Sequence, residues 1–356
     1  MINLKKVFRK KSTLLKIAIF ATGFSGVVAE YILSTLATYF LGDSIFQWIM
    51  IISLMLFSMG LGSRFSKFLH KNLLNKFLLL EFTLSLIVAF SPLFIYLCAA
   101  YTEAYGLLIY LIAIAIGLLI GLEVPLVIRI NNDFEDLRFN ISNILENDYY
   151  GSLLGGVFFA FIGLPLLGLM YTPFVLGLVN FLVACLLIIL LWKAFSSSQK
   201  KKLVPISSVI LILLVGGFFI AKPIILYGEQ SKYQDKVVFS KQTAYQKIVI
   251  TEWKDDFWLY LNGNQQLCSR DEVMYHEPLV HPAMRLHPHP QNVLVLGGGD
   301  GCAVREILKY STVENIKLID LDPEMTRLGK ENKILTQLNK NSLNNHKVEV
   351  INADGY

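Results

Sequence analysis

Long apolar segments separated by short polar ones fill the first 221 residues of the chain. Seven of them reach the length that a helix needs to cross a bilayer, about 17–25 residues. They are Ile17–Leu41, Ile45–Leu61, Phe77–Ala100, Tyr105–Ile128, Gly151–Met170, Pro173–Trp192 and Val204–Ala221. The pattern predicts a polytopic α-helical membrane domain over residues 1–221.

The spacing of apolar residues changes after Pro223 to that of short strands. Strands are expected near Val237–Ser240, Tyr245–Trp253, Phe257–Leu261 and Gln265–Cys268. Asn262-Gly263 between the last two is a strong hairpin signal. A helix over Glu272–Leu286 follows, so residues 222–290 are predicted to form a small antiparallel β-sheet with a connecting helix.

The last part of the chain, residues 291–356, alternates strands and helices. Val293–Leu296, Ile316–Leu321 and Val348–Asn352 are short apolar runs typical of buried parallel strands, with helices expected over Cys302–Tyr310 and from Pro323. This predicts half of a Rossmann-like α/β domain, cut off after its third strand. The strand Val293–Leu296 is expected to have an unpaired apolar edge.

Charge is distributed unevenly between these parts. The net charge of +5 divides into +6 for residues 1–221 and −1 for residues 222–356. A basic surface on the soluble part, which nucleic-acid binding would need, is therefore not expected. Four cysteines without a CxxC pair exclude a disulfide scaffold and a zinc ribbon.

Basic residues cluster at alternate ends of the apolar segments, which marks the cytoplasmic side of a membrane protein. They are Lys5, Lys6, Arg9, Lys10, Lys11, Lys16, Arg64, Lys67, Lys71, Lys76, Lys193, Lys200, Lys201 and Lys202. We expect a multi-pass protein of the cell (inner) membrane with a cytoplasmic N-terminus. Seven crossings would then put the soluble part outside the cytoplasm, an expectation that competes with one given below.

Glu30 and Glu123 are carboxylates that fall inside apolar segments. Intramembrane carboxylates are costly and mark polar cavities, proton paths or buried partners. Glu30 and Glu123 are therefore candidates for handling a ligand or an ion, with hydrogen bonding between helices as the alternative. The pairs Gly117/Gly121 and Gly151/Gly155 indicate close helix packing.

A glycine-rich turn, Gly297-Gly298-Gly299-Asp300-Gly301, directly follows the first parallel strand. A dinucleotide-binding turn would need Gly or Ala where Cys302 stands. The carboxylate of Asp300 repels phosphate and favours a cationic ligand. Asp320, at the end of the next strand, is placed to accept hydrogen bonds from ribose hydroxyls, and Asp354, after the third strand, could bind an adenine amino group.

Tyr275 and His276 precede the turn and could hydrogen-bond an amine, although a structural role is an alternative for each. The histidines His276, His281, His287 and His289 also allow a metal interpretation. Their irregular spacing and the adjacent prolines argue against it, and no metal site is predicted.

These motifs, in this order, resemble those of the spermidine synthases, the polyamine aminopropyltransferases. The resemblance is carried by Tyr245-Gln246, Gly263-x-x-Gln266, Asp271-Glu272-x-x-Tyr275-His276-Glu277, the glycine turn with Arg305-Glu306, Asp320-x-Asp322-Pro323 and Asp354-Gly355. The N-terminal half, with Gly23-Phe24-Ser25-Gly26 before Glu30, Gly121-Leu122-Glu123-Val124-Pro125-Leu126 and Asp148-Tyr149-Tyr150-Gly151, resembles multi-pass bacterial members.

The resemblance implies transfer of an aminopropyl group from decarboxylated S-adenosylmethionine to putrescine, giving spermidine and methylthioadenosine. It implies that Gln246 contacts the nucleoside product, His276 and Asp300 the amine ligands, Asp320 the ribose and Asp354 the adenine. Tyr275 would line the putrescine groove. Because the donor is a cytosolic metabolite, the resemblance favours a cytoplasmic soluble part. No tightly bound cofactor is expected, and a homodimer through the soluble part is left open.

Three features depart from the family pattern. Asp320 stands where the family usually has Glu, and Asn262 where it usually has Asp. The Asp-rich motif that supplies the proton acceptor is expected beyond Tyr356, so the chain as given is expected to lack it and to be inactive. The alternatives are another adenosyl-dependent, methyltransferase-like enzyme and a non-catalytic membrane sensor or transporter of polyamines.

Overall fold

The computed structural model describes the backbone of residues 2–355 and the side chains of residues 11–355, so the side chains of Lys5, Lys6, Arg9 and Lys10 lie outside it. The chain divides into two compact units between Lys232 and Tyr233. The predicted boundary after residue 221 comes too early, because the last long helix continues through Pro223 to Lys232. The two predicted soluble domains form one unit.

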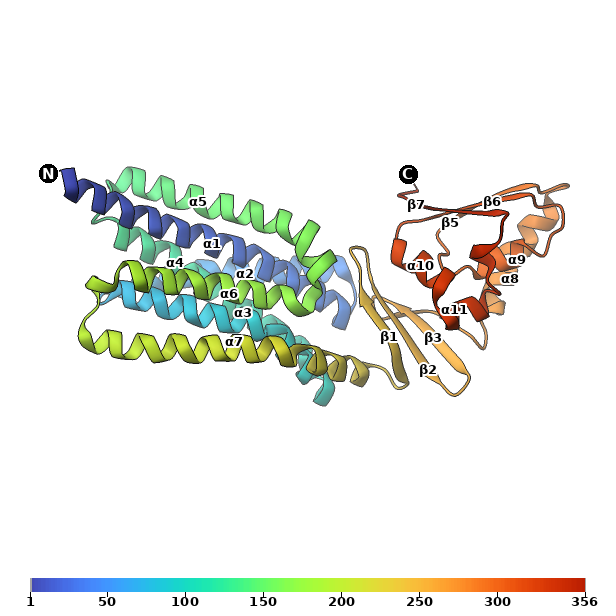
Figure 1. Cartoon of the computed structure of the whole chain (residues 1–356), viewed down its shortest axis with the longest axis horizontal. Coiled ribbons are helices and arrows are strands. Elements are labelled where there is room, and N and C mark those ends of the chain that lie inside the picture. Colours follow the sequence, from blue (N-terminus) through green and yellow to red (C-terminus); the bar gives the residue numbers. More distant parts are fainter. Residues whose placement is uncertain (1, 356) are drawn as a thin grey trace. The chain divides into compact units, whose positions relative to one another are not determined.

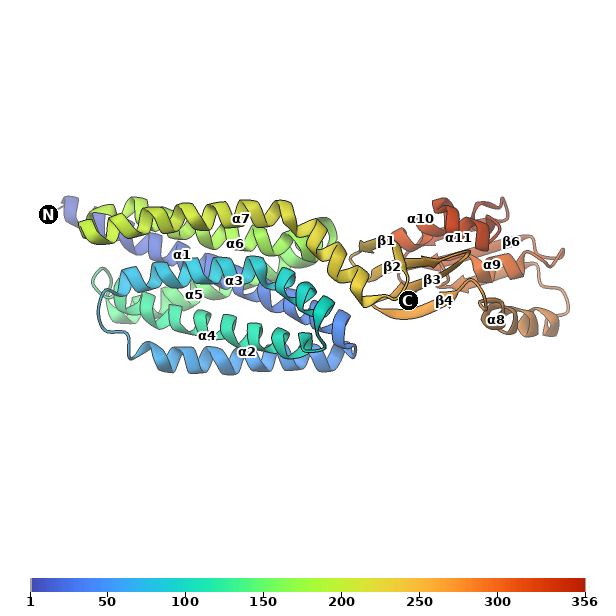
Figure 2. The same ribbon diagram turned by 90° about the horizontal axis from the view of Figure 1, so that it is seen from below.

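The first unit is a bundle of long helices (Figures 1 and 2). They are α1 (Ile2–Leu41), α2 (Ser44–Ser66), α3 (Leu73–Tyr101), α4 (Tyr105–Asn131), α5 (Leu137–Phe158), α6 (Gly168–Leu190) and α7 (Ser197–Lys232). A π-helical segment, η1 (Phe159–Leu167), follows α5, and a 3-10 turn, η2 (Trp192–Ala194), follows α6. The helices alternate in direction, so α1 begins at one end of the bundle and α7 finishes at the other (Figures 1 and 2).

Within the described residues, six helical stretches are long and apolar enough to cross a membrane, one fewer than predicted. The difference arises because the fifth and sixth predicted segments lie in one continuous stretch, Leu137–Leu190. Its direction nevertheless reverses where η1 meets α6 (Figure 1). Gly168 makes this reversal with a φ of 65°, a left-handed conformation that glycine adopts without a Cβ clash.

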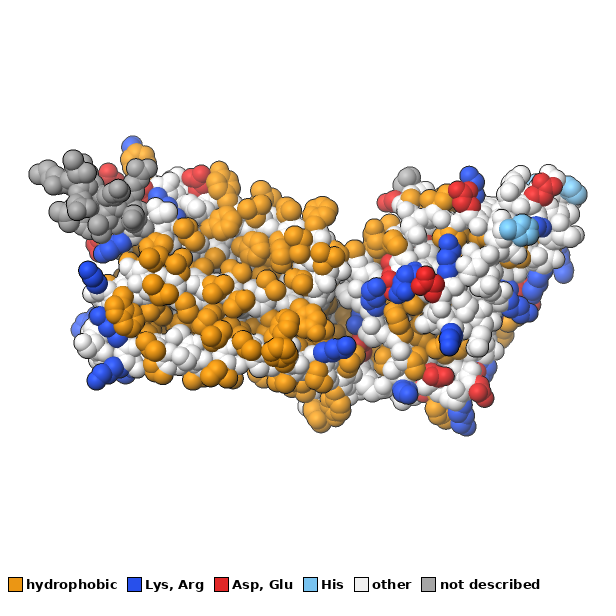
Figure 3. Space-filling model, viewed as in Figure 1, with side chains coloured by type: hydrophobic (Ala, Val, Ile, Leu, Met, Phe, Trp, Pro, Cys, Tyr) orange, Lys and Arg blue, Asp and Glu red, His pale blue; other side chains and the backbone are white. Residues whose placement is uncertain are grey.

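Glycines let the helices approach closely, as the spacing predicts. A Cβ at Gly151 would overlap the carbonyl oxygen of Phe20 on α1, and one at Gly121 would overlap Met59 on α2. The outer surface of the bundle is apolar, with side chains such as Phe57, Phe161 and Ile212 more than 60% exposed. Figure 3 shows hydrophobic side chains over most of the visible face of this unit. Such a surface suits contact with lipid.

The second unit begins with an antiparallel sheet in the order β1-β2-β3-β4. Its strands are β1 (Lys236–Gln242), β2 (Lys247–Trp253), β3 (Asp256–Leu261) and β4 (Asn264–Cys268). The predicted hairpin turn is present, with Asn262 and Gly263 at φ 51° and 81°. The helix α8 (Val273–Leu286) connects this sheet to the next.

A parallel sheet in the order β5-β6-β7 completes the unit. Its elements are β5 (Asn292–Leu296), α9 (Cys302–Ile307), β6 (Asn315–Asp320), α10 (Pro323–Glu331), α11 (Lys333–Leu338), a 3-10 turn η3 (Ser342–Asn344) and β7 (Val348–Asn352). Side chains of β2, β3 and β4 pack on α10 and α11 in one apolar cluster, which joins the two sheets. As predicted, β5 is an edge strand with Leu294 and Leu296 exposed.

Candidate active site

The glycine turn after β5 has the conformation that its composition predicts. Gly297, Gly298 and Gly301 have φ values of 78°, 75° and 83°, where a side chain would be strained. Gly301 precedes the first residue of α9. Gly299 has no such φ, but a Cβ there would come within 2.8 Å of Asp320 Oδ2. The turn therefore needs glycine for two different physical reasons.

A cavity of about 510 Å³ opens beside this turn, at the carboxyl ends of β5 and β6. Five of the six predicted binding residues line it, namely Gln246, Tyr275, His276, Asp300 and Asp320, together with Gly297, Gly298 and Gly299. Asp354 does not line it and is exposed after β7.

The cavity is acidic. Asp300, Asp320 and Asp322 line it, and its described lining contains no lysine or arginine. Asp300 Oδ1 accepts a hydrogen bond from the backbone N–H of Cys302 (2.8 Å), which fixes the carboxylate within the turn. Gln246 donates to Asp322 Oδ2 (3.0 Å). Such an arrangement favours a cationic ligand over a phosphate.

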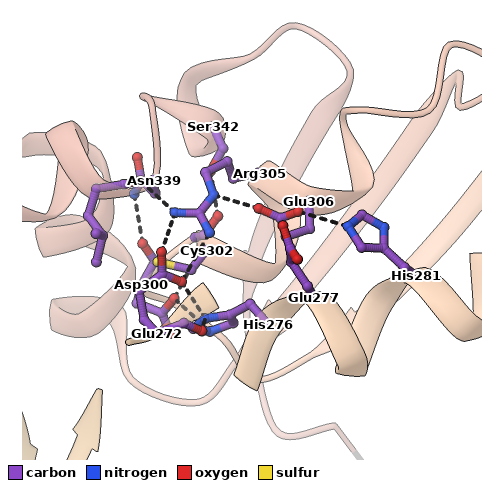
Figure 4. A network of polar contacts seen from close by, with 12 residues as sticks. Glu272, His276, Glu277, His281, Asp300, Cys302, Arg305, Glu306, Asn339 and Ser342 are labelled. Atoms are coloured by element: carbon purple, nitrogen blue, oxygen red, sulfur yellow. Dashed lines mark hydrogen bonds and ion pairs between the residues drawn. The ribbon is translucent and has the colours of Figure 1, made fainter. Parts of the chain in front are cut away.

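His276 is held in place by a buried network (Figure 4). Its Nδ1 lies 2.7 Å from Glu272 Oε2, and its Nε2 lies 3.8 Å from Asp300 Oδ1. Glu272 in turn accepts two hydrogen bonds from Arg305, of 2.7 and 3.0 Å. The Tyr275 ring stands perpendicular to the His276 ring. The ring of His276 is therefore fixed through α9, while the exposed Tyr275 forms part of the rim.

Burial and neighbouring charged groups shift the pKa values of Arg305 and Cys302 in this network. Burial lowers the pKa of Arg305, but its hydrogen bonds to Glu272 and Glu306 outweigh burial and raise that pKa. Burial, followed by the nearby Asp300 carboxylate, raises the pKa of the Cys302 thiol. Arg305 therefore remains a cation, and Cys302 remains a neutral thiol that is not suited to nucleophilic chemistry.

Sequence reasoning assigned no role to Glu272, Arg305 or Asp322, although all three belong to the quoted motifs. The sequence did contain a signal for these three residues. They are charged residues within segments whose other residues follow the apolar spacing of helices or strands. Glu272 and Arg305 are both buried, which makes their pairing a requirement of the fold.

Two groups of side chains have the spacing of metal ligands, Glu272/His276/Cys302 and Glu277/His281/Glu306. The four histidines considered from the sequence do not converge, since His276 and His281 fall into different groups. In the first group Glu272 is already bound by Arg305, and in the second Glu306 is bound by Arg305 and Lys309. Both groups are accounted for as ion-pair networks, and we assign no metal to them.

The fold and the cavity define an α/β protein with an acidic cavity at the carboxyl ends of parallel strands. Comparison with known families makes this specific. The family model for the spermine/spermidine synthase domain matches residues 272–356. The polyamine aminopropyltransferase of Leptospira interrogans is 43% identical over 348 residues, 97% of this chain and 69% of that protein. Polyamine aminopropyltransferase 2 of Aquifex aeolicus is 41% identical over 347 residues, again 97% and 69%.

Solved structures are also similar in part. The spermidine synthase of Thermotoga maritima is 36% identical over 34% of this chain and 42% of its own, with a TM-score of 0.32. From the extent and identity of the two sequence relatives, the chain belongs to the polyamine aminopropyltransferase family.

Proposed function

We propose that this chain is a membrane-anchored aminopropyltransferase that uses decarboxylated S-adenosylmethionine as donor and putrescine as acceptor. The observation that carries the proposal is the acidic cavity, in which Asp300 and Asp320 lie together with Gln246, Tyr275 and His276. Both proposed substrates are cations that require carboxylates, and the nucleoside of the donor suits a strand-end carboxylate such as Asp320.

The reaction depends more on the positions of the two substrates relative to each other than on chemical activation of either substrate. The lone pair of a neutral amine attacks the methylene carbon next to the sulfonium, so a C–N bond forms and the C–S bond breaks. The sulfur keeps the bonding electrons and leaves as a neutral thioether, and the new ammonium releases one proton to a base. Orienting two cations against each other is the main barrier, and fixed carboxylates at the cavity wall lower it.

Release of methylthioadenosine by the full-length protein in detergent or vesicles tests this function. Incubation with putrescine and the decarboxylated donor should release one methylthioadenosine for each spermidine formed. Asp300→Asn should reduce the rate strongly, because it removes a negative charge from the cavity, while Asp255→Asn, in an exposed hairpin turn, should not. Binding of both substrates without release would instead favour a sensor, and methyl transfer from S-adenosylmethionine would favour a methyltransferase.

We further propose that the helical unit anchors the chain in the cell membrane with the N-terminus in the cytoplasm. The apolar outer surface and the length of the helices support anchoring. At the end of the bundle where α1 begins, the connections α2–α3 and α6–α7 contain Lys67, Lys71 and Lys193, whereas the connection α4–α5 contains Asp133, Glu135 and Asp136 and no basic residue. The connections at the other end contain Asp43 and Glu103 and no basic residue. This asymmetry is the one that marks a cytoplasmic face.

The side of the soluble unit depends on how many helices cross the membrane. If all seven cross, α7 leaves the membrane on the side opposite the N-terminus, and the expectations of a cytoplasmic N-terminus and a cytoplasmic soluble unit cannot both hold. Because the proposed donor is a cytosolic metabolite, we propose that the soluble unit lies in the cytoplasm and that one of the seven helices does not cross the membrane.

Cysteine labelling tests this topology. Native Cys268 is a poor probe, because it is buried. Position 255 is exposed, so Asp255→Cys, with Cys98 and Cys185 replaced by serine, should react with a membrane-impermeant maleimide only after the cells are opened. Labelling on intact cells would place the soluble unit outside the cytoplasm and overturn the proposed side.

A further inference from the structure

A polar cluster lies inside the helical unit. It consists of Thr22 on α1, Glu81 on α3, Glu123 on α4 and Asp148 on α5. The side chains of Thr22, Glu81 and Glu123 are fully buried, and Asp148 is partly exposed. Glu81 was not recognised from the sequence as a candidate. Glu30 was predicted as a candidate, but it is only half-buried and does not belong to this cluster.

The two buried carboxyl groups lack partners for most of their oxygens. Thr22 Oγ1 lies 3.2 Å from Glu81 Oε1 and 3.1 Å from the Ala18 carbonyl oxygen. A hydroxyl has one proton, so both contacts are satisfied together when Thr22 donates to Ala18 and a protonated Glu81 donates to Thr22. Glu81 Oε2 and both carboxyl oxygens of Glu123 have no hydrogen-bond partner among the described residues.

Asn180 on α6 adds an unpaired donor at the same level of the bundle. Ser25, one turn beyond Thr22 on α1, donates to Asn180 Oδ1 (2.8 Å), while the buried Nδ2 of Asn180 has no partner among the described residues. Phe82 and Phe181, the neighbours of Glu81 and Asn180, have ring centroids 6.0 Å apart. Asn180 and Glu81 therefore each adjoin a contact between α6 and α3.

The charges around Glu123 are all acidic. Glu81 from α3 and Asp148 from α5 act on it electrostatically, and α1 contributes the neutral Thr22. The one charged side chain of α2 is Arg64, which is exposed, and Arg129 of α4 is bound to the carbonyl oxygens of Ser66 and Leu69. Two buried carboxylates without a counter-cation cannot both be ionised. At least one bound cation is needed.

The close packing of α1 beside the cluster favours a proton over a hydrated ion. Gly23, beside Thr22, packs so closely on α5 that a Cβ would overlap the Asp148 carbonyl oxygen and lie 2.8 Å from Asp148 Oδ1. A Cβ at Gly26, one turn further, would lie 2.9 Å from Ile120 on α4. We propose that Glu81 and Glu123 form an intramembrane proton-binding site, with the partly exposed Asp148 as the group through which the proton exchanges.

Dicyclohexylcarbodiimide, which reacts with protonated carboxyl groups in apolar surroundings, tests this proposal. The full-length protein in sodium-free vesicles should be modified at Glu123 or Glu81, as mapped by mass spectrometry of peptides. The rate should fall about tenfold per pH unit above the titration midpoint, because only the protonated form reacts. Asp148→Asn should slow the pH response of labelling without abolishing it.

Matched variants and sodium separate the alternatives. Glu123→Gln and Glu81→Gln should each alter labelling at the remaining carboxyl, whereas Glu103→Gln, in the exposed α3–α4 connection, should not. Retention volume in gel filtration and helix content by circular dichroism report whether each variant is folded. Unlabelled wild-type protein, labelling independent of pH, or protection by sodium at constant pH would each overturn the proposal.

Discussion

Asp320 Oδ2 accepts a hydrogen bond from the backbone N–H of Gly299 (2.9 Å), which ties the end of β6 to the glycine turn that follows β5. The other oxygen of the same carboxylate accepts from the N–H of Asp322 (2.9 Å). Each oxygen keeps a second lone pair, so the carboxylate can shape the turn and still accept from ribose hydroxyls. Asp320, which the sequence predicts to bind the donor, therefore also stabilises the glycine turn that lines the cavity.

Asp320→Asn should weaken donor binding. One oxygen becomes an NH₂ donor, so it faces either the Gly299 or the Asp322 N–H and leaves that group unpaired. The unpaired N–H lowers the stability of the turn, and the loss of a hydrogen bond between the charged carboxylate and the ribose, about 1.5–3 kcal/mol, predicts a rise of about 10- to 150-fold in the KM for decarboxylated S-adenosylmethionine. Steady-state methylthioadenosine release measures this, with Asp255→Asn as control. An unchanged KM would show that Asp320 neither shapes the turn nor contacts the donor.

Arg305→Leu should destabilise the soluble unit. The substitution leaves Glu272 and Glu306 buried without the cation that both contact, and breaking a buried ion pair costs about 3–5 kcal/mol. Urea unfolding followed by tryptophan fluorescence measures the loss. The surface pair Arg270–Asp256 provides the control, because solvent screens it, and Arg270→Leu should change the midpoint little. Equal effects of the two substitutions would contradict the structural role of Arg305.

The same network explains which parts of the site the sequence could predict. The glycine turn and Asp320 adjoin short apolar runs whose period predicts parallel strands, so their place at the strand ends follows from local pattern alone. Glu272 and Arg305 are 33 residues apart, and only the packing of α8 against α9 brings them together. For the same reason Glu81 could not be paired with Glu123. The end of α7 was mispredicted because Pro223 is accommodated inside the helix rather than ending it.

Stability of the soluble unit should fall in acid, in part through Glu306. Burial raises the pKa of this carboxyl, but hydrogen bonds from Lys309 and Arg305 outweigh burial and hold the pKa below its ordinary value of 4.5. A lowered folded-state pKa stabilises the fold above pH 4.5, and that contribution is lost as the pH falls through the folded-state value.

Glu306→Gln should therefore make the free energy of unfolding less dependent on pH in this range. Urea unfolding at a series of pH values below 5 measures the slope, and Glu349→Gln, an exposed position on β7, is the matched control. A wild-type slope in Glu306→Gln would mean that other carboxylates account for the acid sensitivity.

Gly151→Ala should separate α1 from α5, whereas Gly156→Ala on the same helix should not. A Cβ at position 151 would overlap the carbonyl oxygen of Phe20, which is rigid backbone, while one at position 156 would lie 3.6 Å from the Tyr31 ring, an ordinary contact. Overpacking of this kind costs about 1–3 kcal/mol, and the second substitution should even gain slightly from the helix propensity of alanine. Thermal unfolding in detergent, followed by circular dichroism, measures the difference.

Because Asp148 lies one turn before Gly151, the Gly151→Ala protein should also show altered carbodiimide labelling at Glu123. Equal unfolding temperatures for the two variants would mean that α1 and α5 do not pack through this glycine.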